Sequence, residues 1–110
     1  MGMTRREREK LIRLLVLFEG MKTLLDDHDG IASARGVFSQ IIAYLKAVLS
    51  DEPEAYEGVI TSIAKKYSEL FFPKFGLSEF YIYTADGKTM RELNLDYEKM
   101  RKEIEKILRI

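Results

Sequence analysis

Cysteine is absent from the sequence. This absence excludes disulfide bonds, cysteine-ligated zinc, iron–sulfur clusters and cysteine nucleophiles together. A chain without cysteine also fits a reducing compartment, so the expected location is the cytoplasm. Residues Met1-Gly2 precede a second methionine and read as a vector-derived addition. The charged stretch that follows lacks the apolar core of a signal peptide.

Excess charge and long apolar runs are also missing. Lysine plus arginine number 18, as do aspartate plus glutamate, so the formal net charge is zero. A general nucleic-acid binder or a protein held on anionic lipid would carry a basic excess. No apolar run is long enough to cross a bilayer. The expected partner is therefore another protein or a second copy of this chain, and not nucleic acid or a membrane.

Catalytic and cofactor-binding motifs are the third absence. His28 is the only histidine, and no G-x-S-x-G turn exists that would present a nucleophilic serine to it. The glycines are scattered, and none forms a G-x-G-x-x-G or P-loop pattern. We therefore expect no enzyme and no cofactor.

Helical periodicity dominates what the sequence does contain. The length of 110 residues suits a single domain over residues 1–110. Apolar residues recur at three- and four-residue steps in four segments, which predicts four α-helices. The first two connections are short, so the helices that they join should be antiparallel neighbours. The predicted fold is an all-α four-helix bundle, with helices over Arg5–Asp27, Ile31–Leu49, Glu52–Phe72 and Met90–Leu108.

Local signals refine these helices. The pairs Thr4–Glu7 and Thr89–Glu92 have capping-box spacing, and Ser50 or Asp51 is expected to cap the third helix. Gly36, within the second apolar stripe, suggests a close helix–helix contact. The first helix should bury the apolar residues Leu11, Leu14, Leu15, Phe18, Met21, Leu24 and Leu25. The last helix has an apolar seam with coiled-coil-like spacing, formed by Leu93, Tyr97, Met100, Ile104 and Ile107. Two ion pairs are expected along the last helix, Glu98–Lys102 and Glu105–Arg109.

The segment between the third and fourth helices is too long for a structureless link in a compact domain. Alternating apolar residues over 80–84 favour an extended conformation, and residues 85–88 are typical of a turn. We expect an ordered aromatic extended strap that lies across the helices or pairs with the strap of another copy. Its aromatic side chains either fill the core or anchor a partner, and the candidate partner-binding residues are Phe75, Phe80, Tyr81 and Tyr83.

Three charged clusters have simple structural interpretations. Carboxylates and one imidazole can bind a divalent metal, but residues 26–29 lack EF-hand spacing and read more simply as a solvated helix end. The acids over 51–57 suit the positive end of the third helix. The basic residues over 5–13 are interleaved with Glu7 and Glu9 and read as a solvated helix face. The weak metal candidates are Asp26, Asp27, His28 and Asp29; the other two clusters are Asp51, Glu52, Glu54 and Glu57, and Arg5, Arg6, Arg8, Lys10 and Arg13.

The run from Lys65 to Tyr83 contains Tyr67, Leu70-Phe71, Pro73 and Gly76-Leu77-Ser78-Glu79-Phe80. It resembles an uncharacterised family of small bacterial proteins that share this stretch, followed by an asparagine, here Asn94, and a charged closing helix. The resemblance covers the C-terminal half of the chain and implies no site residues. Immunity and antitoxin proteins of this size and helical class act by binding another protein, which is an analogy of class.

The leading hypothesis from the sequence is thus a bacterial protein-interaction module, immunity- or antitoxin-like by that analogy. One alternative is a structural homodimer that uses the seam of the last helix or the edge of the strap. The other is a protein that binds a divalent metal or a small ligand at residues 26–29.

Overall fold

The computed structural model describes residues 3–27, 32–51, 55–70 and 84–110. These ranges form four α-helices and contain no strand, so the predicted all-α class is confirmed. The aromatic strap, with Phe75, Phe80, Tyr81 and Tyr83, lies outside the described residues. The helices are α1 (Arg5–Asp27), α2 (Ala32–Asp51), α3 (Tyr56–Glu69) and α4 (Gly87–Leu108).

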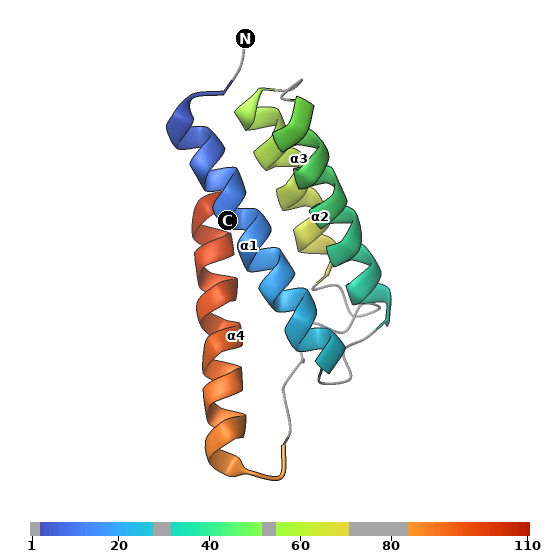
Figure 1. Cartoon of the computed structure of the whole chain (residues 1–110), viewed down its shortest axis with the longest axis vertical. Coiled ribbons are helices and arrows are strands. Elements are labelled where there is room, and N and C mark those ends of the chain that lie inside the picture. The colour runs from blue at the N-terminus through green and yellow to red at the C-terminus, as the bar shows by residue number, and fades with distance from the viewer. Residues whose placement is uncertain (1–2, 28–31, 52–54, 71–83) are drawn as a thin grey trace.

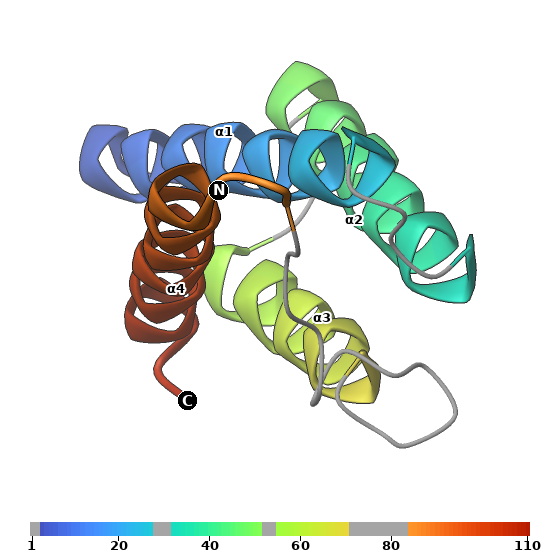
Figure 2. The same ribbon diagram turned by 90° about the horizontal axis from the view of Figure 1, so that it is seen from below.

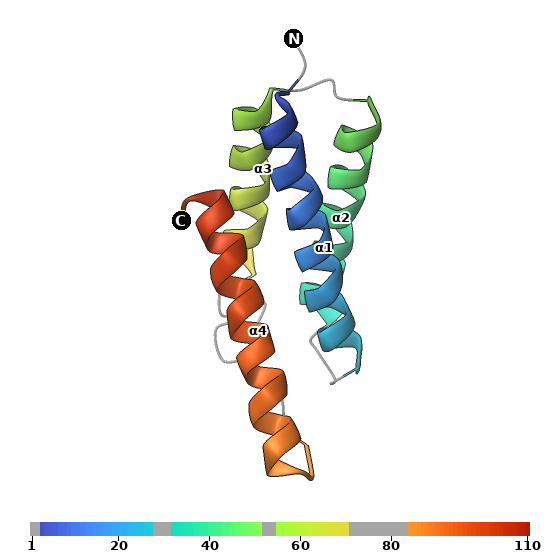
Figure 3. The same ribbon diagram turned by 60° about the vertical axis from the view of Figure 1, so that its left-hand side comes forward.

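The four helices run alternately down and up and form a bundle, as predicted (Figure 1). Each helix packs mainly on two neighbours, because α1 and α3 both contact α2 and α4. Seen from below, α1 and α3 face each other across the bundle with α2 and α4 on either side (Figure 2). The first turns of α4 extend beyond the lower ends of the other helices (Figure 3). Its buried residues are Tyr97, Ile104 and Leu108, so the fourth helix docks mainly through its second half.

An aromatic cluster joins three of the helices at the centre of the core. The ring of Phe18 lies 5.8 Å from that of Phe38 in α2 and 6.0 Å from that of Tyr67 in α3, centroid to centroid. All three side chains are buried. Tilted and edge-on ring pairs at such distances are favourable beyond their burial, and truncating a buried aromatic residue costs about 3–5 kcal/mol.

The buried face of α1 differs in part from the predicted one. Leu17 is buried although it lies outside the predicted stripe, while Leu15 and Leu24 are only partly buried. The reason is that α1 has two principal neighbours, and Leu17 faces Met100 across a hollow between α1 and α4. The residues of α1 that are fully or almost fully buried are Leu11, Leu14, Leu17, Phe18, Met21 and Leu25.

The capping box predicted for α1 is confirmed. The backbone N–H of Thr4 donates to the carboxylate of Glu7 over 2.9 Å, and the backbone N–H of Glu7 donates to the Thr4 hydroxyl over 3.1 Å. Two of the donors that a helix start leaves without intrahelical partners are thereby satisfied.

The capping box predicted at Thr89–Glu92 is wrong. Helix α4 begins three residues earlier than predicted, at Gly87, and its N-cap is Asp86. The Asp86 carboxylate accepts from the backbone N–H of Lys88 over 3.1 Å and from the hydroxyl of Thr89 over 2.6 Å. These hydrogen bonds lower the pKa of Asp86, with the Thr89 bond as the main cause. An aspartate is a strong N-cap, and it takes the place that a turn was expected to hold over residues 85–88.

The boundary between α2 and α3 also differs from the prediction. Helix α2 continues through Ser50 and Asp51, so neither residue caps α3. Within the described residues α3 begins at Tyr56, and its N-cap Ala55 makes no side-chain hydrogen bond. An alanine has no acceptor to offer the free N–H groups of the first turn.

Close helix packing occurs at Gly20 and not at Gly36, where it was predicted. Gly36 is exposed, and a Cβ atom built there meets no other atom within 4 Å. A Cβ atom at Gly20 would lie 3.0 Å from the sulfur of Met100 in α4. A larger residue at this position would therefore force the Met100 side chain to shift where α1 meets α4.

These two glycines yield a stability prediction. Gly36→Ala should raise the free energy of unfolding by about 0.5–1 kcal/mol, because alanine is the better helix former and the site is open. Gly20→Ala should gain less or lose stability, because the Met100 side chain must move. Urea unfolding of both variants beside the parent protein measures this, and an equal gain at both positions would contradict the packing described here.

Candidate functional site

The metal-site candidates are only partly described. Asp26 and Asp27 lie in the last turn of α1, while His28 and Asp29 lie outside the described residues. The Asp26 carboxylate pairs with Lys22 at 2.8 Å and with Arg35 of α2 at 3.5 Å. Both cations lower its pKa, the Lys22 hydrogen bond most. Within the described ranges no three metal-ligating side chains gather, and Asp26 links the end of α1 to α2.

The basic residues at the start of α1 were predicted to form a solvated face, but two of them bridge helices. Arg8 donates to the backbone carbonyl of Leu49 over 3.0 Å, which caps the last turns of α2. Arg13 makes two hydrogen bonds to the Glu103 carboxylate of α4, of 2.5 and 2.8 Å. The Arg13 hydrogen bond is the main cause of the lowered pKa of Glu103.

Ion pairing along α4 also differs from the prediction. Arg101 contacts Glu98 at 3.6 Å and Glu105 at 2.9 Å, in place of the predicted pairs with Lys102 and Arg109. Arg101 lies one turn from each glutamate, so its guanidinium reaches both. Arg109 instead pairs with Glu57 of α3.

The apolar seam of α4 is used within the chain. Tyr97 and Ile104 are buried in the bundle core, and Leu93, Met100 and Ile107 are partly buried. The seam suggested a homodimer interface at the sequence level, but here it mainly packs α4 onto α1 and α3.

A buried polar contact joins α3 to α4. The Tyr67 hydroxyl donates to the Glu105 carboxylate over 2.7 Å, and Arg101 holds the same carboxylate oxygen. Burial is the main cause that raises the pKa of Tyr67, and the Glu105 contact raises it further. Tyr97 lies on the same side of α4 as Arg101 and Glu105, and burial likewise raises the pKa of Tyr97 to about 12. Neither phenol ionises near neutral pH, so neither tyrosine is a general base there.

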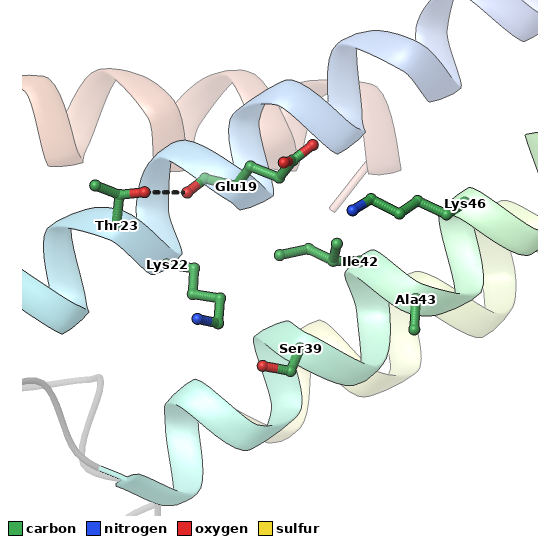
Figure 4. A pocket seen from close by; sticks show the side chains of 7 residues that line it. All are labelled: Glu19, Lys22, Thr23, Ser39, Ile42, Ala43 and Lys46. Carbon is green, nitrogen blue, oxygen red and sulfur yellow. Dashed lines mark hydrogen bonds between the residues drawn. The ribbon is translucent and has the colours of Figure 1, made fainter.

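A shallow groove opens between α1 and α2 (Figure 4). Its volume is about 460 Å³. The side chains of Ile42 and Lys46 extend from α2 toward α1, and Lys22 lies at the α1 side (Figure 4). The groove thus combines the apolar side chain of Ile42 with charged residues from both helices. Its lining residues are Glu19, Lys22, Thr23, Ser39, Ile42, Ala43 and Lys46.

Two exposed aliphatic residues continue this groove along α1. Ile12 is 44% exposed and Val16 is 52% exposed. Together with Glu19 and Thr23 of the groove they are spaced by four, three and four residues, which places all four on one helix face. We call Ile12, Val16 and the groove residues the α1–α2 face. The apolar stripe predicted for this helix follows its buried positions and so leaves out Ile12 and Val16. An aliphatic i, i+4 pair outside the buried stripe is nevertheless visible in the sequence.

The predicted partner-binding residues Phe75, Phe80, Tyr81 and Tyr83 lie outside the described residues, so their role stays a prediction. Comparison with known proteins adds no family: no protein-family model, curated protein or solved structure matches the chain. Within the described ranges, no helix combines the length and the apolar character needed to cross a bilayer.

The buried tyrosines predict alkaline instability. Above pH 10.0, the ordinary tyrosine pKa, Tyr97 of the unfolded chain releases its proton while the folded protein keeps it up to about 12. The unfolded state then binds fewer protons, so the free energy of unfolding falls as the pH rises through this window, and the contribution is intact below it. Urea unfolding across the window measures the slope. Tyr97→Phe should reduce it, and an unchanged slope in that variant would contradict the assignment.

Proposed function

We propose that this chain is a cytoplasmic protein-interaction module that binds a partner protein through the α1–α2 face. The observation that carries the proposal is the exposure of Ile12 and Val16 in line with a groove that Ile42 and Ala43 help to line. Protein interfaces combine an apolar centre with a polar rim, and Glu19 and Lys46 supply such a rim here.

The exposed aliphatic pair supplies the binding free energy in this proposal. Burying apolar surface contributes about 25 cal/mol per Å², so seating Ile12 and Val16 in a partner is favourable. Because they lie on successive turns of a helix that the bundle core holds in place, little conformational entropy is lost on binding. An immunity- or antitoxin-like role, in which the module occupies another protein, is the specific form of this proposal.

Substitution of Val16 tests the surface. Val16→Glu should weaken partner binding about tenfold or more, because a charge replaces a central apolar contact. The matched control is Leu95→Glu, which places the same charge at a residue that is 55% exposed on α4. An affinity pull-down from the native host, followed by titration of the retained protein against both variants, measures the effect. Equal binding by Val16→Glu and Leu95→Glu would contradict the proposed face.

A third variant separates this face from the strap. Tyr81→Ala combined with Tyr83→Ala removes the two strap tyrosines predicted to bind a partner. If the α1–α2 face is the main contact, this variant retains the partner that Val16→Glu loses. The opposite pattern would move the interface to the strap, and recovery of the protein alone at a dimer mass would favour the homodimer.

A further inference from the structure

A second hollow lies where three helix ends meet, remote from the α1–α2 face. The first turns of α1, the first turn of α3 and the last turns of α4 enclose a cleft of about 670 Å³. It shares no lining residue with the groove between α1 and α2. Its volume lies within the range of small-molecule sites, about 300–1,000 Å³.

The last turn of α4 is fixed in place at this cleft. Arg109 has a left-handed backbone with φ of 61°, and the backbone N–H of Ile110 bonds back to the carbonyl of Glu105 over 3.0 Å. This is a Schellman end, which a glycine usually forms. The arginine side chain pairs with Glu57 in the first turn of α3, so the two helix ends are tied together across the cleft.

The cleft has spare positive charge. Its carboxylates already have partners: Glu57 pairs with Arg109, Glu103 pairs with Arg13, and Glu7 accepts from the backbone of Thr4. Arg6, Lys10 and Lys106 also line the cleft, and within the described part of the chain no ion pair engages any of them. Three cations therefore lie around a space whose acids are mostly neutralised.

A tyrosine hydroxyl lines the same space. Tyr56, the first residue of α3, is 8% exposed and is part of the cleft wall. Its hydroxyl makes no hydrogen bond to any residue within the described ranges, and its oxygen is open to the cleft. Burial raises its pKa, while Arg109 acts in the opposite direction, so the group remains a donor at neutral pH. The hydroxyl is therefore available to donate to an acceptor bound in the cleft.

The backbone at this point favours an anion as that acceptor. Within the described residues, Ala55 provides no side-chain cap to the N–H groups in the first turn of α3. A helix N-terminus carries a partial positive charge and suits a phosphate. The Tyr56 ring and Ile107 add apolar wall, which an inorganic ion alone would not use.

We propose that this cleft binds a phosphate monoester. Arg6, Lys10 and Lys106 pair with the phosphate, the Tyr56 hydroxyl donates to it, and the organic group packs against the Tyr56 ring and Ile107. The second pKa of a phosphate monoester is about 6, so the group is mostly a dianion at neutral pH. A dianion can pair with more than one of these cations. This site is independent of partner binding at the α1–α2 face.

Calorimetric titration with phenyl phosphate, inorganic phosphate and benzoate at neutral pH and low salt tests the proposal. We expect phenyl phosphate to bind most tightly, because only it has both the dianion and the apolar group. The double variant Lys10→Gln/Lys106→Gln should weaken it about tenfold or more, since hydrogen bonds to charged groups are lost. Tyr56→Phe, which keeps the ring, should weaken it about threefold or more at an unchanged thermal unfolding midpoint.

The matched control is Lys65→Gln/Lys88→Gln, which removes the same charge from two exposed lysines elsewhere. This control should bind phenyl phosphate like the parent protein. Equal weakening by the two double variants would reduce the effect to net charge and overturn the site. Benzoate binding as tight as that of phenyl phosphate would overturn the phosphate assignment, and the absence of saturable binding by the parent protein would overturn the proposal outright.

Discussion

Burial of the Tyr67 hydroxyl is the constraint on which the arrangement of the four helices depends. A buried phenol without a partner is costly, so the helix that supplies the acceptor must lie at a fixed place. Glu105 supplies it, and Arg101 holds that carboxylate from the same helix. The Tyr67 ring packs on the ring of Phe18, which also contacts the ring of Phe38. One side chain therefore connects α3 to α1 and α4, and through Phe18 to α2.

This docking of α4 through its second half decides which surfaces remain open. The Arg13–Glu103 and Arg109–Glu57 pairs hold the end of α4 beside α1 and α3, which creates the cleft lined by Tyr56. Because α4 covers one side of α1 and α2 covers another, the stripe with Ile12 and Val16 is left facing outward. The two proposed binding surfaces are thus consequences of one packing arrangement, and they lie on separate parts of the bundle.

Much of this fold could be predicted from the sequence, because local chemistry determines it. The Thr4–Glu7 capping box and the limits of α1 depend only on neighbouring residues, and both are confirmed. Choices between competing neighbours could not be predicted. Asp86 and Thr89 are both good caps, and only the structure shows that Asp86 begins α4. The burial of Leu17, the close approach at Gly20 and the cleft around Tyr56 all require knowing which helices meet.

The most direct test of the account is a double-mutant cycle between Tyr67→Phe and Glu105→Ala, with urea unfolding of the parent protein, both single variants and the double variant. If the hydroxyl–carboxylate contact joins α3 to α4, the two substitutions should be coupled by about 1.5–3 kcal/mol, as expected for a hydrogen bond to a charged group. Additive effects, with a coupling free energy within about 0.5 kcal/mol of zero, would show that α4 is held by apolar packing alone and would contradict the account.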